Sequence, residues 1–150
     1  MDTLQIEHVF ASDSHARSVV RGVVSRDGLP TAVDTYPTAF VCNTHTGDQP
    51  GQHWIAIYAS SKKTGEYFDS FGLPPLYPAF RRFLQDNCEE WTYNNKTLQS
   101  PLSTVCGQYC AAYLLLRSRG VPMINFVKTF NTDLVANDRR VFNWIKDIGY

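Results

Sequence analysis

The segment Ser103–Arg117 predicts a helix that is apolar around nearly its whole circumference, and few folds can accommodate such a helix. It includes Cys110–Leu116, the longest uninterrupted apolar run in the chain. That run is far shorter than the roughly 20 residues of a membrane span, whereas a helix that is apolar on all sides is typical of the centre of a packed domain. We therefore expect Ser103 or Thr104 to cap a central helix that the remainder of the chain covers.

The length and charge of the chain set further limits. With 150 residues, the chain is expected to form one domain over residues 1–150 and to need neither a disulfide nor a metal for stability. Lys plus Arg and Asp plus Glu number 14 each, which gives no net charge. Proteins that bind mainly to phosphates are strongly basic, so we expect nucleic acid to be at most a secondary partner. The first residues carry no secretory signal, which predicts an intracellular protein without a membrane partner.

The remaining pattern predicts helices toward the ends of the chain and strands in its middle. The predicted strands are Thr38–Cys42, Trp54–Ala59, one that begins at Glu66–Asp69, and Trp91–Leu98. The other predicted helices are Asp13–Arg26, Pro78 to about Asp86, Val121–Phe130, and Asp138–Ile148, the last capped by Asn137. This order favours the α+β class, with a short, mostly antiparallel sheet packed on helices.

The four cysteines, at positions 42, 88, 106 and 110, are expected to be reduced thiols because no signal peptide is visible. Cys106 and Cys110 are four residues apart, so on a helix they lie on one face. The paired ligand spacings of structural zinc sites are missing from the sequence. We therefore expect no metal and no other cofactor.

Three segments carry side chains that combine into one chemistry. His53 stands at the mouth of a predicted strand, Asp69 at the end of its partner strand, and Cys106 in the first turn of the central helix. A helix N-terminus lowers the pKa of a thiol, an imidazole can take up its proton, and a carboxylate on the other ring nitrogen orients that imidazole. Gln99 precedes Cys106 by seven residues and can donate a hydrogen bond to an oxyanion. The pattern predicts nucleophilic catalysis by a thiol.

This ordered set resembles the adenovirus protease (adenain) family, which is related to the ubiquitin-like-protein proteases and shares their chain order of His, acid, Gln and Cys. The resemblance is carried by His53-Trp54, by the acid in Tyr67-Phe68-Asp69-Ser70-Phe71-Gly72, by Gln99, and by Cys106-Gly107. It extends from about Thr38 to Leu116, and Val141–Ile145 resembles a late helix of the family. The acid is an aspartate, as in the ubiquitin-like proteases, where adenovirus proteases have glutamate.

The resemblance implies a papain-like cysteine protease architecture in permuted chain order, with a short mixed sheet packed on helices. It implies that Cys106 is the nucleophile, that His53 is the general base and acid, and that Asp69 orients the imidazole. Gln99 and the backbone N–H of Cys106 would then stabilise the oxyanion. The implied reaction is endopeptidase cleavage after small residues, with glycine preferred.

The resemblance also implies substrates and partners. Trp54 would roof a narrow channel that admits glycine, and Gly107 would bind substrate beside the nucleophile. The substrate would be a polypeptide, either a capsid precursor of a virus or virus-like transposon or a ubiquitin-like modifier, met in the host nucleus or cytoplasm or in the virion. Adenovirus proteases are activated by DNA and by a disulfide-linked viral peptide, and Cys88 falls about where the peptide-linking cysteine lies.

Two other functions remain open from the residues. One is an isopeptidase that removes ubiquitin or a ubiquitin-like modifier, which needs a broad surface to hold the modifier. The other is a catalytically silent domain that binds peptides or assembles particles. Each candidate residue also has a plainer role: Cys106 as a core thiol, His53 as a strand-end histidine, Asp69 as a turn cap, Gln99 as a surface amide, Trp54 as core, and Cys88 as an ordinary thiol.

Overall fold

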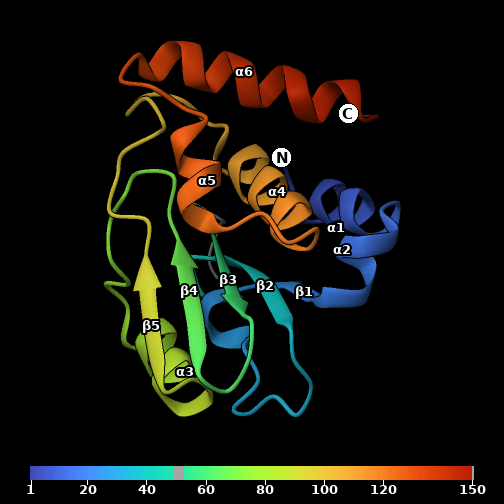
Figure 1. Cartoon of the computed structure of the whole chain (residues 1–150), viewed down its shortest axis with the longest axis vertical. Helices are drawn as coiled ribbons and strands as arrows, with labels where there is room; N and C mark the ends of the chain where they lie inside the picture. Colours follow the sequence, from blue (N-terminus) through green and yellow to red (C-terminus); the bar gives the residue numbers. More distant parts are fainter. Residues whose placement is uncertain (49–52, 150) are drawn as a thin grey trace.

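The computed structural model describes residues 1–48 and 53–149 (Figure 1). In chain order the elements are α1 (Thr3–Ala11), α2 (Ser14–Val19), β1 (Val20–Val24), a 3₁₀ turn (Arg26–Gly28), β2 (Thr38–Asn43), β3 (Trp54–Ala59), β4 (Thr64–Phe68), α3 (Pro78–Asn87), β5 (Glu90–Tyr93), α4 (Cys106–Arg117), α5 (Met123–Lys128) and α6 (Leu134–Asp147). The expected α+β class is confirmed.

The sheet has five strands in the order β1-β2-β3-β4-β5. The two inner pairings are antiparallel, and the two outer pairings, β1 with β2 and β4 with β5, are parallel. The sheet is therefore mixed, rather than mostly antiparallel as the strand pattern predicts. In the β3–β4 pair, Ala56 lies opposite Phe68, so the start of β3 lies beside the end of β4. This register brings His53 and Asp69 to the same edge of the sheet.

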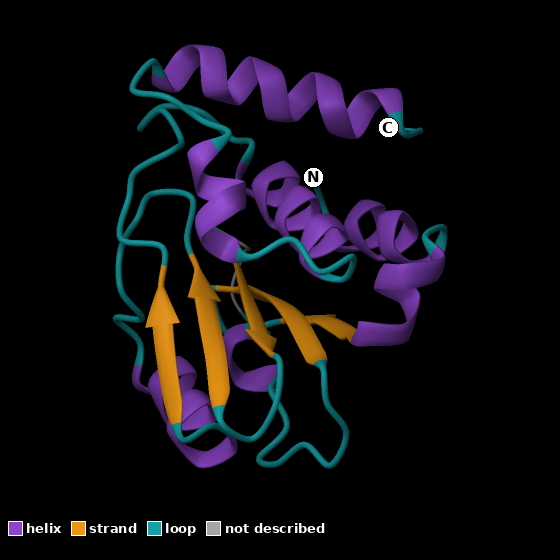
Figure 2. Cartoon of the chain, viewed as in Figure 1, coloured by secondary structure: helices purple, strands orange, loops and turns teal. Residues whose placement is uncertain are grey.

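Both faces of the sheet are covered (Figure 2). The core on one face contains side chains of α1, α2, α4, α5 and α6, and the core on the other face contains side chains of α3. Alternate residues of β3 separate accordingly, since Ala56 lies in the first core whereas Ile55 and Ile57 lie in the second. The short period of a strand thus supplies two apolar faces from one nearly continuous apolar run.

The central position expected for the apolar helix is confirmed. Helix α4 packs against β3 and against α1, α2, α5 and α6, and Tyr109, Tyr113 and Leu114 are almost completely buried. The helix begins at Cys106, later than predicted, and no side chain caps it. The N-cap position is Val105, so Ser103 lies two residues before it, and the oxygens of Ser103 accept hydrogen bonds from Gln99. The first N–H groups of α4 thereby stay available for other partners.

The N-terminal prediction of a helix over Asp13–Arg26 is wrong in its second half. Asp13 does cap a helix, α2, by accepting a hydrogen bond from the Ala16 N–H, but the chain becomes strand β1 at Val20. β-branched valines favour an extended backbone once a neighbouring strand is available, and β2 supplies that neighbour. Helix α1 was not predicted, although Asp2 and Gln5 form a capping box at its start.

The C-terminal half departs from the prediction at two places. Strand β5 ends at Tyr93, because the following Asn94 turns its side chain to the backbone of Asp69 and Asn95 has a left-handed φ of 46°. Asn137 does not cap the last helix, since α6 begins earlier and is capped by Asp133. Asn137 is instead buried, where its amide donates to the carbonyl oxygen of Leu98.

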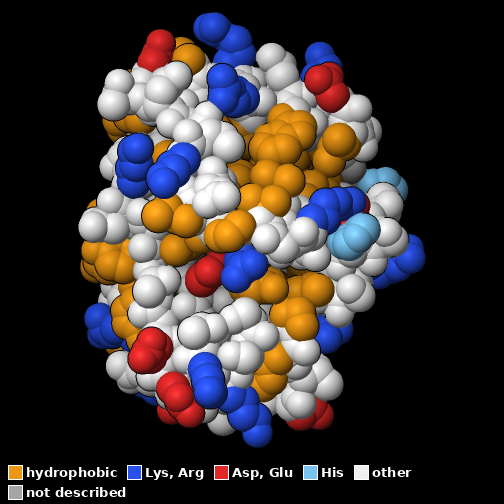
Figure 3. Space-filling model, viewed as in Figure 1, with side chains coloured by type: hydrophobic (Ala, Val, Ile, Leu, Met, Phe, Trp, Pro, Cys, Tyr) orange, Lys and Arg blue, Asp and Glu red, His pale blue; other side chains and the backbone are white. Residues whose placement is uncertain are grey.

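Hydrophobic side chains gather on the face shown in Figure 3, below α6. A groove between α1, α4 and α6 lies there, lined in part by Leu115, Leu116, Trp144 and Ile148. Within the described residues, no helix combines the length and the apolar composition that crossing a membrane requires.

Candidate active site

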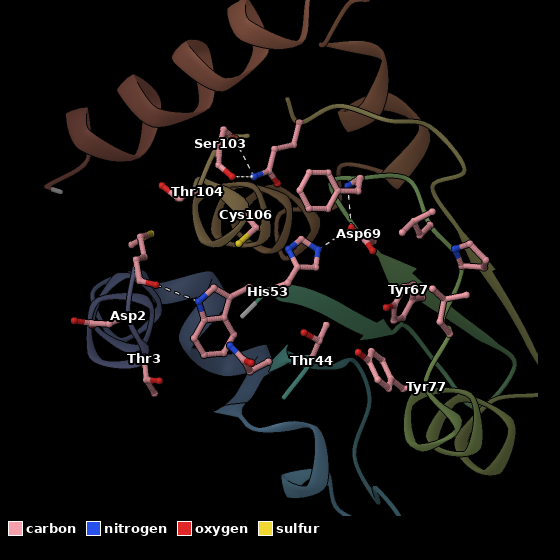
Figure 4. Close-up of a pocket in the computed structure, with 18 residues that line it drawn as sticks. Asp2, Thr3, Thr44, His53, Tyr67, Asp69, Tyr77, Ser103, Thr104 and Cys106 are labelled. Carbon is pink, nitrogen blue, oxygen red and sulfur yellow. Dashed lines mark hydrogen bonds and ion pairs between the residues drawn. The ribbon is translucent and has the colours of Figure 1, made fainter. Parts of the chain in front are cut away.

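A cavity of about 810 Å³ opens where β3, β4 and α4 meet. Its lining includes the predicted site residues His53, Trp54, Asp69, Gln99 and Cys106. These residues come from three parts of the chain, and the structure brings all of them together. In Figure 4 the His53 ring lies between Cys106 and Asp69.

The His53 imidazole is oriented by Asp69. Its Nε2 lies 2.9 Å from Asp69 Oδ1, which leaves Nδ1 for the thiol of Cys106. The Phe71 ring stacks on the imidazole at a centroid distance of 4.8 Å and limits its rotation. A histidine held by a carboxylate on one nitrogen presents the other nitrogen in a fixed direction.

The Cys106 thiol is activated by its surroundings. Burial by itself raises its pKa, but a hydrogen bond with His53 and backbone hydrogen bonds from Trp54 and Gly107 lower the pKa below the usual value of a thiol. Cys106 is also the first residue of α4, where the helix dipole favours an anion. The arrangement thus raises the fraction of Cys106 that is present as thiolate, relative to an ordinary thiol at the same pH.

Asp69 and Cys106 raise the pKa of His53. Burial lowers the pKa of the imidazole, but the hydrogen bonds to Asp69 and Cys106, together with their negative charge, outweigh burial and raise the pKa to about 9. With a pKa of about 9, His53 is an imidazolium at neutral pH, and it stands beside a thiol whose pKa is lowered. A thiolate and an imidazolium in contact can act as a nucleophile and a proton donor.

Asp69 is held in place by groups that sequence reasoning did not identify. The Asn94 amide donates to the Asp69 carbonyl oxygen at 2.7 Å, and the Asp69 N–H donates back to Asn94 Oδ1 at 3.0 Å. The Phe71 N–H donates to Asp69 Oδ1 at 2.8 Å. The sequence held one indication of the role of Asn94. An asparagine that interrupts a predicted strand is typical of a side chain that forms hydrogen bonds with the backbone.

Gln99 is buried rather than on the surface. Its Oε1 accepts a hydrogen bond from Ser70 Oγ at 2.5 Å, and its Nε2 donates to the carbonyl oxygen and the hydroxyl of Ser103 at 3.0 and 2.9 Å. The Ser70 carbonyl oxygen also accepts the N–H groups of Leu98 and Gln99. Ser70, which directly follows Asp69, therefore links the amide to the strand that carries the acid. Its role was not foreseen from the sequence.

Trp54 is the first residue of β3 and lines the same cavity as Cys106 and His53. Its indole N–H donates to the carbonyl oxygen of Met1 at 3.1 Å, and Met1 itself lines the cavity. Gly107 is buried against both residues. A Cβ added at Gly107 would lie only 3.1 Å from Met1 Cβ and 3.4 Å from Trp54 Cδ1. Gly107 thus packs against the cavity wall and reaches the site through its backbone N–H.

The other three cysteines differ from Cys106. Burial raises the pKa of Cys42, Cys88 and Cys110, and all four cysteines are free thiols. Among the described residues, no group of three or more His, Cys, Asp or Glu side chains is arranged to hold a metal ion.

We expect iodoacetamide at about pH 7 to alkylate Cys106 at least about tenfold faster than Cys88, because the thiolate is the reacting species and the two pKa values shift in opposite directions. Peptide mapping by mass spectrometry measures both rates. In guanidinium the two rates should converge. Equal rates in the folded protein would contradict an activated Cys106 and favour the silent domain.

No family model matches the chain. Over 88 residues it is 31% identical to the protease of Bovine adenovirus C serotype 10, a match that covers 49% of this chain and 45% of that protein. The crystal structure of the ASFV pS273R protease is 26% identical, with a TM-score of 0.51 over 73% of this chain and 43% of that one. A structure of the SUMO protease Ulp1, in which the catalytic cysteine is oxidized to a sulfinic acid, has a TM-score of 0.55 at 15% identity and covers 99% of this chain and 78% of that one.

These similarities confirm the relationship to the adenovirus protease and, at the level of the fold, to the ubiquitin-like proteases. This chain spans less than half the length of the two viral proteases that it matches.

Proposed function

We propose that this protein is a cysteine endopeptidase that cleaves after small residues, with glycine preferred, and that it processes viral or transposon structural proteins. The observation that carries the proposal is the chain of contacts from Cys106 through His53 to Asp69 in one cavity, with the pKa of the thiol lowered and that of the imidazole raised. The two viral proteases that match the chain support the same activity.

In the proposed reaction, the Cys106 thiolate attacks the carbonyl carbon of the scissile bond and forms a C–S bond. The carbonyl π electrons move to oxygen as an oxyanion, then return as the C–N bond breaks and the leaving nitrogen takes a proton from His53. A water molecule then attacks the thioester while His53 accepts its proton. Breaking the C–S bond releases the new carboxyl group and restores the thiolate.

Two donors are proposed for the oxyanion. The backbone N–H of Cys106 is at the start of α4 and has no partner within the helix. The Nε2 of Gln99 is the second donor, and it would turn one N–H from Ser103 Oγ to the oxyanion when substrate binds. Ser70 holds the other end of the amide during this exchange, so that only the donor end has to move.

The preference for a small residue rests on the side of the cavity where Trp54 lies. The indole is fixed against Met1 by a hydrogen bond, and Gly107 packs behind both residues. A substrate residue that lies between Cys106 and this wall meets an indole that cannot move aside without breaking its hydrogen bond to Met1, and we expect this to favour glycine.

The remaining proposals concern partners. The viral relatives favour substrates met in the infected cell or the virion. A peptide linked through Cys88 is less well supported, because this thiol is only 6% exposed and burial raises its pKa. The chain has no net charge, which favours no more than a secondary role for nucleic acid.

The test is cleavage of a mixed peptide library followed by sequencing of the cut ends. We expect cuts after glycine. Suicide probes based on ubiquitin and on SUMO test the alternative isopeptidase, since reaction of Cys106 with such a probe without cleavage of any peptide would favour it.

The pH profile of cleavage should be bell-shaped. On the acid side kcat/KM rises as Cys106 loses its proton, and on the alkaline side it falls as pH passes about 9, because His53 then loses the proton that the leaving group needs. Initial rates between about pH 5 and about pH 10.5 measure the profile. A rate that continues to rise above pH 9 would contradict the role of His53 as general acid.

A further inference from the structure

An apolar wall lies beside His53 in the active-site cavity. Its members line the cavity together and follow Asp69 in the sequence: Phe71, Leu73, Pro74, Leu76 and Tyr77. In Figure 4, Tyr77 lies on one side of the Cys106–His53 pair, and Asp2 and Thr3 lie on the other. The two ends of the cavity therefore differ in chemistry, because the wall carries no charge whereas the opposite end includes the Asp2 carboxylate.

The proton transfer from His53 to the leaving nitrogen indicates which part of a substrate binds at each end of the cavity. The leaving nitrogen must approach His53 to receive its proton, so the residues after the scissile bond lie on the side of the imidazole. Phe71 stacks on that imidazole and begins the apolar wall. The acyl part of the substrate then lies toward the opposite end of the cavity, where Asp2 and Thr3 lie (Figure 4). This assignment rests on the proposed function.

Two leucine side chains of the apolar wall are exposed to solvent inside the cavity. Leu73 is 47% exposed and Leu76 is 60% exposed, and both face the cavity that contains the nucleophile. Exposed apolar side chains that gather in a cavity mark a binding site for apolar groups. A substrate side chain that covers them removes water from both surfaces.

The wall is also held in position before any substrate arrives. The Gly72 N–H donates to the Asp69 carbonyl oxygen at 2.7 Å, and Thr97 Oγ1 donates to the Phe71 carbonyl oxygen at 3.0 Å. Farther along, the Arg26 guanidinium lies 4.2 Å from the centre of the Tyr77 ring. A surface that is already ordered loses little conformational entropy on binding.

We propose that this apolar wall binds the residues that follow the scissile bond, and that the protein selects substrates with large apolar side chains at the first two positions after the cut.

The test uses three peptides that are identical up to the cleaved glycine and then continue with Leu-Leu, Ser-Ser or Glu-Glu. We expect the protein to cleave the Leu-Leu peptide with a kcat/KM about tenfold higher than the Glu-Glu peptide. In the double variant Leu73→Ser, Leu76→Ser this preference should fall to about twofold. The matched control is Ile124→Ser on α5, which is 61% exposed and should keep the full preference.

Equal cleavage of the three peptides, or an apolar preference that the double variant retains, would overturn this inference and leave the proposed function intact. A protein that cleaves none of the three, and none of the library peptides, overturns both proposals together.

Discussion

Replacing Cys106 by alanine is expected to lower peptide cleavage by at least about 10⁴-fold, because the proposed acyl intermediate forms on the Cys106 sulfur. The substitution removes one sulfur atom from a residue that is 8% exposed, so the fold should be retained. The measurements are kcat/KM on a glycine-containing peptide and the thermal unfolding midpoint.

Cys110→Ala is the matched control for this loss. Cys110 lies one turn along α4, is completely buried, and does not line the cavity. Its loss should cost about 1 kcal/mol of stability through a small cavity and leave the cleavage rate within about threefold. If the Cys106→Ala variant still cleaves while the Cys110→Ala variant does not, Cys106 is not the nucleophile.

Gly72→Ala is expected to have the largest effect on stability. Gly72 has a φ of 77°, where an L-residue is strained, and a Cβ would stand 2.5 Å from the Lys96 carbonyl carbon and 2.7 Å from Thr97 N. These are backbone atoms, so the segment after Asp69 must move away from the segment before Gln99. We expect a loss of about 3 kcal/mol, seen as a fall of about 10 °C in the unfolding midpoint.

The same displacement should impair the site. The N–H of Gly72 donates to the carbonyl oxygen of Asp69, so a shift of Gly72 also disturbs Asp69. We therefore expect a lower kcat even at temperatures where the variant is still folded. Gly120→Ala is the control, since Gly120 also has a positive φ, 88°, but a Cβ there would meet nothing within 4 Å. It should lose only about 1 kcal/mol. Equal losses in the two variants would contradict the steric argument at Gly72.

Some elements followed directly from local pattern. Strand β3 matches its predicted bounds, and α3 and β2 differ from theirs by one residue, because a period of two or a proline at a helix start is a property of neighbouring residues. The residue types that meet in the cavity were also predictable. A thiol, an imidazole, a carboxylate and an amide in this order predict a reaction class before any contact is known.

Other elements depended on partners far along the chain. Val20–Val24 follows a helix and has the valine stripe of one, yet it forms β1 because β2 offers a parallel edge. Asn137 has the residue type of a cap but bonds to Leu98 from within α6. In each case a hydrogen bond to a distant segment outweighed the local preference, which is worth only a fraction of a kcal/mol per residue.

By itself the sequence determined the chemical types in the site, their order along the chain, and the apolar helix that must stand at the centre. Only the tertiary structure decided that β3 and β4 pair in the register that joins His53 to Asp69, that Ser70 and Asn94 hold the amide and the acid, and that an apolar wall follows Asp69. The physical reason is range: periodicity and capping act within a few residues, whereas the pKa shifts and hydrogen bonds of the site arise between groups that become neighbours only when the core is packed.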